Sequence, residues 1–219
     1  MTDVPGATRR LILLRHGQTK YNADNRMQGQ LDTELSDLGR AQARNAASAL
    51  VGRAPISIVS SDLRRAYDTA VEIGDNVGLP VQIDTRLRET HLGNWQGLTH
   101  LEVDTRSPGA RAKWRGDATW APPGGESRID VARRSKPMVA ELIEKYEGWA
   151  EQPVVLVAHG GLIAALTATL LDLPVDRWPA LGGLGNASWA QLSAHGSLES
   201  LEWRLDVWNA SASVASDNL

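Results

Sequence analysis

Two histidines stand at equivalent places in the sequence, each after a short apolar run and each before a glycine. His16 follows residues 11–14 after one intervening arginine, and His159 follows the run at residues 153–158. Short continuous apolar runs are typical of strands that are buried on both faces. Ligands of an α/β sheet bind beyond the carboxyl ends of its strands, so we expect both imidazoles at one rim of the sheet.

Cationic side chains are expected at the same rim. Arg15 precedes His16, and Arg64 and Arg65 follow a further short strand predicted at residues 56–59. Guanidinium groups and the amides of a helix N-terminus both bind tetrahedral oxyanions. The expected ligand is therefore a phosphate group. Helical spacing alone does not choose between Arg64 and Arg65.

The histidines suggest phosphoryl transfer through a covalent intermediate. In-line attack of a neutral His16 on phosphorus would form a phosphohistidine. Arg15, one of the two later arginines and His159 would hold the phosphoryl oxygens as their charge redistributes. A hydrogen bond from Nδ1–H of His16 to a backbone carbonyl such as that of Gly17 would fix the reactive tautomer.

A proton donor is also required, and Glu89 is the expected one. It follows another predicted strand, at residues 81–83, which places it at the same rim. Glu89 would protonate the leaving alkoxide and later take a proton from water, and apolar surroundings would help to keep it protonated before the reaction. The alternative is a surface carboxylate paired with Arg86 or Arg88.

Composition excludes several other functions. The formal net charge of −3, without a block of Lys or Arg, argues against binding to nucleic acid or to an anionic membrane. The chain has no cysteine, which excludes thiolate chemistry and agrees with a cytoplasmic location. Residues 1–8 lack the apolar core of a signal peptide, and no apolar stretch is long enough to span a bilayer. Because arginines accompany the candidate ligands, we expect neither a catalytic metal nor another cofactor.

Strands alternate with helices, which predicts an α/β fold with a mostly parallel sheet covered by helices on both faces. We expect one domain over residues 1–219, with a core at about 10–208 and a short polar tail at 209–219. The region from 86 to 125 looks irregular. A helix is expected to begin at Ser36, with Leu38, Ala41, Ala46 and Leu50 at helical spacing on its inner stripe. Further helices are expected after Asp62 and over 127–146 and 162–171, and antiparallel strands at 188–192 and 200–207.

A combined set of motifs runs from about residue 10 to residue 192. It comprises LRHGQT at 14–19 with Asn22, LDTELS at 31–36, SDLRRAYDTA at 61–70, LRE at 87–89, GES at 125–127 and VAHGG at 157–161. This set resembles the histidine phosphatase superfamily, which includes phosphoglycerate mutases. The resemblance implies a three-layer α/β/α sandwich and a phosphohistidine at His16. It selects Arg65 over Arg64 as a phosphate ligand, marks Glu89 as the proton donor and implies substrate binding by Asn22, Gln28 and Gly160.

Residues 90–95 favour a phosphatase over a mutase of that family. Mutases have Arg-His-Tyr-Gly after the acidic residue, whereas this chain has THLGNW. A mutase must shield its phosphohistidine from water, while a phosphatase admits water. Further likeness within the family implies a small phosphorylated sugar acid as substrate and a part in the synthesis of a methylglucose-containing polysaccharide. A mutase, a phosphatase of broad specificity and a non-catalytic binding module are the alternatives.

Other residues receive weaker expectations. Gln28, Gln30, His91 and a nearby tryptophan are candidates for contacts with the sugar ring, although His91, like His100 and His195, is also expected at the surface. The tryptophans at 114, 120, 149 and 178 are expected to serve packing. Trp189, Trp203 and Trp208 in the late strands suggest an apolar edge that could join two copies in a homodimer.

Overall fold

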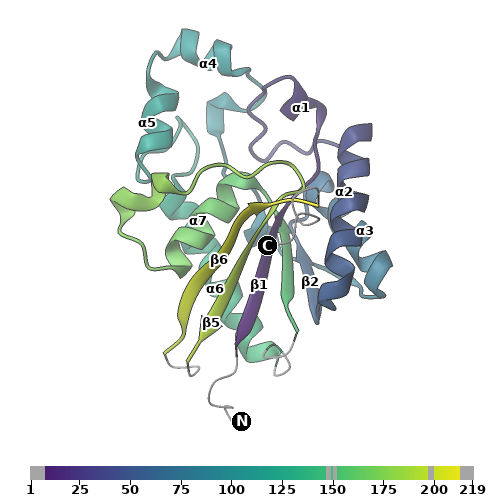
Figure 1. The fold of residues 1–219 in the computed structure, drawn as a ribbon. Coiled ribbons are helices and arrows are strands. Elements are labelled where there is room, and N and C mark those ends of the chain that lie inside the picture. Colours follow the sequence, from purple (N-terminus) through teal and green to yellow (C-terminus); the bar gives the residue numbers. More distant parts are fainter. Residues whose placement is uncertain (1–7, 147–148, 150–151, 197–199, 213–219) are drawn as a thin grey trace.

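A computed structural model describes residues 8–146, 149, 152–196 and 200–212. Its centre is a six-stranded sheet with the order β3-β2-β4-β1-β5-β6 (Figure 1). The first four of these strands are parallel to one another, β5 runs antiparallel to β1, and β6 runs antiparallel to β5. The strands are β1 (Arg9–Arg15), β2 (Ser57–Ser60), β3 (Val81–Ile83), β4 (Val154–Ala158), β5 (Trp189–His195) and β6 (Glu202–Ala210).

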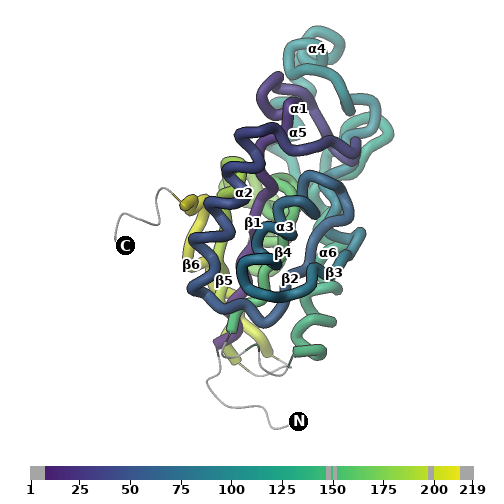
Figure 2. Tube along the Cα trace, turned by 90° about the vertical axis from the view of Figure 1, so that its right-hand side faces the viewer, coloured from purple at the N-terminus to yellow at the C-terminus, as the bar shows by residue number. Residues whose placement is uncertain are grey.

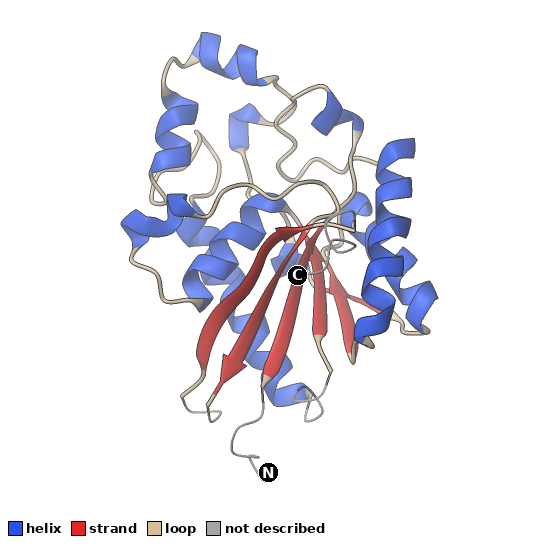
Figure 3. Ribbon diagram, viewed as in Figure 1, coloured by secondary structure: helices blue, strands red, loops and turns tan. Residues whose placement is uncertain are grey.

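Helices cover both faces of the sheet, so the predicted three-layer fold is confirmed (Figure 3). Helices α2 (Asp37–Leu50) and α3 (Arg64–Val77) lie on one face, and α6 (Arg128–Lys145) and α7 (Gly160–Leu170) lie on the other. Alternation along β1 explains its apolar run: Leu11 and Leu13 pack toward α6 and α7, and Ile12 and Leu14 pack toward α2 and α3. Each face of the central strand therefore contributes to a separate part of the core.

Helix α2 begins where the sequence predicts, but its buried stripe differs. The hydroxyl of Ser36 accepts a hydrogen bond from the backbone N–H of Gly39, as an N-cap residue does. Leu38, expected to face inward, is 54% exposed, and Ala41 is half-buried. Ala46 and Leu50 of the predicted stripe are buried, together with Gly39, Ala43 and Ala47.

Glycine is required where α2 meets the loop after β1. A Cβ on Gly17 would lie 2.3 Å from the carbonyl oxygen of Gly39, and a Cβ on Gly39 would lie 2.0 Å from that of Gln18. Neither backbone atom can yield to a side chain. This close approach lets α2 support the segment that carries His16.

The expectation of an irregular region over 86–125 is wrong in part. Helices α4 (His100–Arg106) and α5 (Ala110–Gly116) lie here, and together with α1 (Lys20–Ala23) they stand beyond the carboxyl ends of the parallel strands (Figure 2). We call α4 and α5 the cap. A small separate cluster holds them, with Met27, Leu92, Trp95 and Val103 buried at its centre. The short 3-10 helices are Val51–Arg53, Thr85–Leu87, Gly93–Trp95 and Val175–Ala180.

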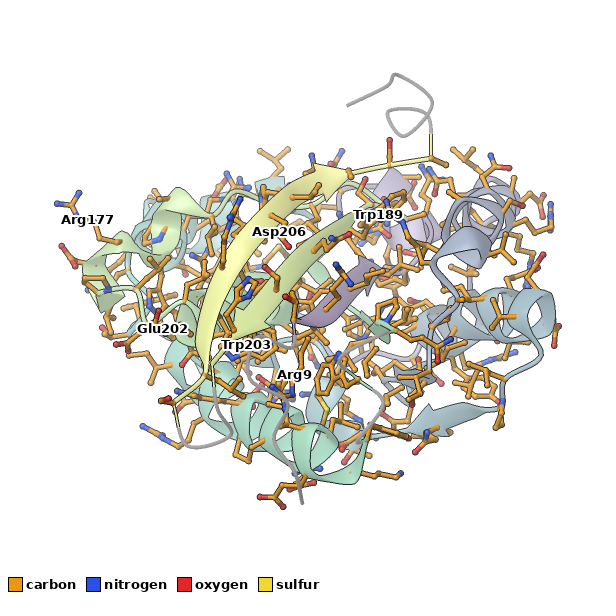
Figure 4. All side chains as sticks on the ribbon, turned by 60° about the horizontal axis from the view of Figure 1, so that its bottom comes forward. Arg9, Arg177, Trp189, Glu202, Trp203 and Asp206 are labelled. Atoms are coloured by element: carbon orange, nitrogen blue, oxygen red, sulfur yellow. The ribbon has the colours of Figure 1, made fainter. Side chains whose placement is uncertain are left out.

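Strand β6 forms the edge of the sheet at the antiparallel end (Figure 4). Its Glu202, Arg204 and Asp206 are exposed, a charge pattern that discourages pairing with another sheet. Trp203 and Trp208 are half-buried against the core. Trp189 is only 3% exposed, so the expectation that it belongs to an exposed apolar edge is wrong.

The end of the chain partly departs from the expected tail. Residues 209 and 210 belong to β6, whereas residues 213–219 lie outside the described part of the chain. Residues 1–7, which were expected not to form a signal peptide, also lie outside it. In the part of the chain described, no helix combines the length and apolarity needed to cross a membrane.

Candidate active site

The two histidines lie at one rim of the sheet because their strands are parallel neighbours in register. Arg15 at the end of β1 pairs with Ala158 at the end of β4. The backbone N–H of His16 then donates to the carbonyl of Ala158 over 3.1 Å. The ring centroids of His16 and His159 lie 5.1 Å apart, and their residues are 2% and 0% exposed.

His16 is held as a neutral imidazole with one nitrogen available for attack. Its Nδ1 lies 2.6 Å from the carbonyl oxygen of Gly17, so Nδ1 carries the proton and Nε2 keeps its lone pair. Burial, followed by the charges of Arg65 and Arg15, holds the pKa of His16 well below its ordinary value of 6.5. At neutral pH Nε2 is therefore unprotonated, as a nucleophilic imidazole must be.

Arg65 contacts the unprotonated nitrogen of His16 directly. Its Nε donates to Nε2 of His16 over 3.2 Å, and its two terminal nitrogens donate to the carbonyls of Leu31 and Gly29 over 2.7 Å each. Burial lowers the pKa of Arg65 to about 10, which still leaves it charged at neutral pH. Arg64 points elsewhere and forms an exposed ion pair with Glu34 at 2.6 Å.

Arg15 and His159 contribute buried polar atoms that have no partner among the described residues. Arg15 donates through Nη1 to the carbonyl of Leu184, but its buried Nε has no partner among the described residues. Both ring nitrogens of His159 are likewise buried without a hydrogen-bond partner among the described residues. Burial, and then the charge of Arg65, holds the pKa of His159 well below 6.5. Buried polar atoms without partners are costly, and an oxyanion beside His16 would accept hydrogen bonds from Nε of Arg15 and from the single N–H of a neutral His159.

Glu89 lies in the same cavity, but its surroundings are not the apolar ones expected. Its carboxylate accepts hydrogen bonds from the backbone N–H groups of Thr90, Gly161 and Leu162 at 2.7, 3.1 and 3.1 Å. The last two amides belong to the first turn of α7, so this helix positions the carboxylate. Glu89 does not pair with Arg86 or Arg88. Arg86 forms ion pairs with Asp84 and Glu141, and Arg88 forms one with Asp62.

Arg134, which the sequence analysis missed, supports Glu89 from below the rim. It donates to the carbonyl of Glu89 over 3.0 Å and to that of Arg86 over 2.6 Å. Its guanidinium also pairs with Glu126 at 2.9 Å, and Glu126 accepts from the backbone N–H of His91. The GES motif at 125–127 was the signal that could have indicated this network.

The remaining predicted substrate-binding residues divide into two groups. Asn22, Gln28 and Gly160 line the cavity. Asn22 accepts from Thr19 and Asn186, and Gln28 accepts from the hydroxyls of Thr19 and Thr33. Two residues considered for the sugar, however, are not among those lining it. Gln30 donates to the carbonyl of Glu89, and Nδ1 of His91 accepts from the backbone of Gly93.

The cavity has a volume of about 500 Å³ and extends from the rim toward the cap. His100 lines it, although it was expected at the surface, and so does Trp114, which was expected to serve packing alone. Arg115, Arg128 and residues of the segment 179–184 complete this outer part, and none of them was predicted. Within the described residues, no group of three or more His, Cys, Asp or Glu side chains could hold a metal ion.

Comparison with known proteins places these groups in context. The family model of the histidine phosphatase superfamily, branch 1, matches residues 11–211. The glucosyl-3-phosphoglycerate phosphatase of Mycobacterium tuberculosis is 66% identical over 96% of this chain and 99% of its own length. The metal-independent phosphoserine phosphatase of Arabidopsis thaliana is 32% identical over 91% of this chain and 80% of its own.

Solved structures agree with the sequence relatives. A mycobacterial glucosyl-3-phosphoglycerate phosphatase in complex with VO3 has a TM-score of 0.90 and 69% identity, covering 93% of this chain and all of that one. A complex of such a mycobacterial enzyme with inorganic phosphate has a TM-score of 0.88 and 67% identity, covering 93% of this chain and 98% of that one. By its sequence and its fold, this chain belongs to the histidine phosphatase superfamily.

Proposed function

We propose that this protein is a phosphatase that converts glucosyl-3-phosphoglycerate to glucosylglycerate and phosphate through a phosphohistidine on His16. The observation that carries this proposal is the neutral His16, whose Nε2 faces Arg65 while Nδ1 is bound to Gly17. The substrate is taken from the relatives that share about two thirds of the sequence. Its sugar-acid product would enter the synthesis of a methylglucose-containing polysaccharide.

The first half-reaction transfers the phosphoryl group to the enzyme. The lone pair on Nε2 of His16 attacks phosphorus, and the bond from phosphorus to the ester oxygen breaks as the new N–P bond forms. Arg15, Arg65 and His159 donate hydrogen bonds to the phosphoryl oxygens. Glu89 is the proposed donor of the proton that the leaving alkoxide takes up.

The second half-reaction restores the enzyme. Glu89, now a carboxylate, takes a proton from a water molecule, whose oxygen attacks phosphorus. The N–P bond breaks, phosphate leaves and Nε2 of His16 regains its lone pair. Hydrogen bonds from Gly161 and Leu162 hold the carboxylate in place for both proton transfers. The arginines that bind phosphate would repel a divalent cation, so we propose that the reaction needs no metal.

The mechanism is tested with His16→Ala and with His195→Ala as control, because His195 is exposed and lies outside the cavity. Phosphate release is measured from glucosyl-3-phosphoglycerate, 3-phosphoglycerate and phosphoserine, and quenched reactions are analysed for acid-labile phosphohistidine. We expect release to be fastest from glucosyl-3-phosphoglycerate and to be lost in His16→Ala alone. Full activity in His16→Ala would refute the mechanism.

The same panel separates the alternatives. A mutase would convert 3-phosphoglycerate to 2-phosphoglycerate faster than it releases phosphate. A binding module would bind the esters without hydrolysis. A cytoplasmic location, and a homodimer detectable by light scattering, stay predictions.

A further inference from the structure

The outer part of the cavity contains groups that the proposed phosphoryl transfer does not use. His100 from α4, Trp114 and Arg115 from α5, and Arg128 at the start of α6 line the same cavity as His16. Helices α4 and α5 lie beyond the sheet rim (Figure 1), and Arg128 is the first residue of α6. They therefore face the part of a substrate that extends away from its phosphate.

Two of these side chains hold buried donors without acceptors. Nη1 of Arg128 and Nε1 of Trp114 are buried and have no hydrogen-bond partner within the described residues. The guanidinium carbon of Arg128 lies 5.8 Å from the centroid of the Trp114 ring, so the two groups belong to one small site. Unpartnered buried donors are rare because they cost stability, and a ligand that supplies acceptors removes that cost.

The chemistry of the donors selects the kind of ligand. A guanidinium and an indole N–H can only donate, whereas a site for sugar hydroxyls also needs acceptors. Glu89 is the one acidic residue among those that line the cavity, and its oxygens already accept from backbone amides. No carboxylate among the described residues forms an ion pair with Arg128. A planar guanidinium matches a ligand carboxylate in both charge and geometry.

We propose that Arg128 and Trp114 bind the carboxylate of the substrate, while the groups around His16 bind its phosphate. This inference rests on the proposed function, because the glycerate unit of that substrate carries a carboxylate and a phosphate ester on one three-carbon chain. Arg128 and Trp114 thus select esters that hold a second anion a few bonds from the phosphate. They orient the ester oxygen toward Glu89 without taking part in the chemical steps.

The test compares two esters that differ at one carbon. 3-Phosphoglycerate has a carboxylate where glycerol 3-phosphate has a hydroxymethyl group, and neither contains a sugar. In Arg128→Gln, the ratio of kcat/KM for 3-phosphoglycerate to that for glycerol 3-phosphate should fall about 10- to 100-fold, the range for loss of a charged hydrogen bond. Trp114→Phe keeps a ring but removes the N–H, and should lower the same ratio about 3- to 10-fold.

Arg133→Gln is the matched control, because Arg133 lies on the same helix with a side chain that is 75% exposed. It should leave the ratio unchanged. An equal loss on both esters in Arg128→Gln, or no loss on either, would overturn the carboxylate site. If wild-type protein releases phosphate from no ester, the proposed function fails. Calorimetric binding of the same two esters to wild type and Arg128→Gln then tests the site: a preference for 3-phosphoglycerate that Arg128→Gln loses supports it, and equal affinities overturn it.

Discussion

Acidification from pH 7.0 to 5.5 should destabilise the folded protein through His16 and His159. Burial above all, and then the charge of Arg65, holds the pKa of both imidazoles well below the ordinary value. Each regains a pKa of about 6.5 when the chain unfolds. Below that pH the unfolded state binds protons that the folded state does not, so the free energy of unfolding decreases as the pH falls. The loss stops only when the pH reaches the lowered pKa of the folded protein.

The size of the effect follows from proton linkage. A histidine that stays neutral when folded and titrates near 6.5 when unfolded loses about 1 kcal/mol between pH 7.0 and 5.5. The two buried imidazoles together should therefore lower the free energy of unfolding by about 2–3 kcal/mol. His100 is half-buried, and burial also lowers its pKa, so it adds a smaller change of the same sign.

Urea unfolding followed by tryptophan fluorescence measures this change, since the chain contains eight tryptophans. The buffers must be free of phosphate, because a ligand of the folded state would stabilise it. His159→Gln should reduce the pH dependence by about 1 kcal/mol relative to wild type. His195→Gln, at an exposed position, should retain the full dependence. If His159→Gln is as sensitive to pH as wild type, the reasoning about buried neutral imidazoles is wrong.

Three other predictions concern catalysis. Gly161→Ala would bring a Cβ to 2.5 Å from Oε1 of Glu89, and the resulting displacement of the carboxylate should lower kcat about 100-fold. The control is Gly116→Ala, which has open space around it and should leave kcat unchanged. Equal kcat values for the two variants would contradict the role of α7. Arg134→Gln should lower the free energy of unfolding in urea by about 1–3 kcal/mol, because it leaves the carbonyl of Glu89 without its charged donor. It should also lower kcat more than it changes KM. A variant with the kcat of the wild type would show that catalysis does not require Arg134. In pH profiles, kcat/KM expressed for the dianionic ester should stay level as the pH falls through about 6.5, since the pKa of His16 lies well below its ordinary value. An acid limb at that pH that remains after this allowance for ionisation of the substrate would contradict a neutral nucleophile.

The sheet and its rim could be predicted because local sequence specifies them. The apolar runs before His16 and His159 are strands buried on both faces. Parallel pairing then brings the two rings together without any further information. Ser36 gave the start of α2 for the same reason, since capping depends on residues only three positions apart.

The cap could not be predicted, because long-range contacts stabilise it. Helices α4 and α5 have seven residues each, too few to form alone. Their packing depends on Met27, which is distant in sequence. The exposure of Leu38 was mispredicted for a related reason. The close approach of Gly39 to Gln18 sets the orientation of α2, and the spacing of apolar side chains cannot show that a residue without a side chain faces inward.

Arg134 and Arg128 show the limit at the site itself. On α6 they lie six positions apart, and helical periodicity does not distinguish them from the exposed Arg133 between them. Only the folded chain gives Arg134 the carbonyl of Glu89 and places Arg128 beside Trp114. Whether an arginine is buried or exposed depends on which distant segments of the chain pack against it.

The pairing of Arg15 with Ala158 has a consequence for how such enzymes diversify. The separation of the two imidazoles is set by backbone hydrogen bonds between neighbouring strands, whereas the outer wall of the cavity belongs to short helices with a small core of their own. Substitutions in α4 and α5 can thus reshape the outer wall while the spacing of the histidines stays constant. The reaction and the choice of substrate therefore depend on different parts of the fold. For the same reason, the cap is the segment to exchange when a different substrate is wanted.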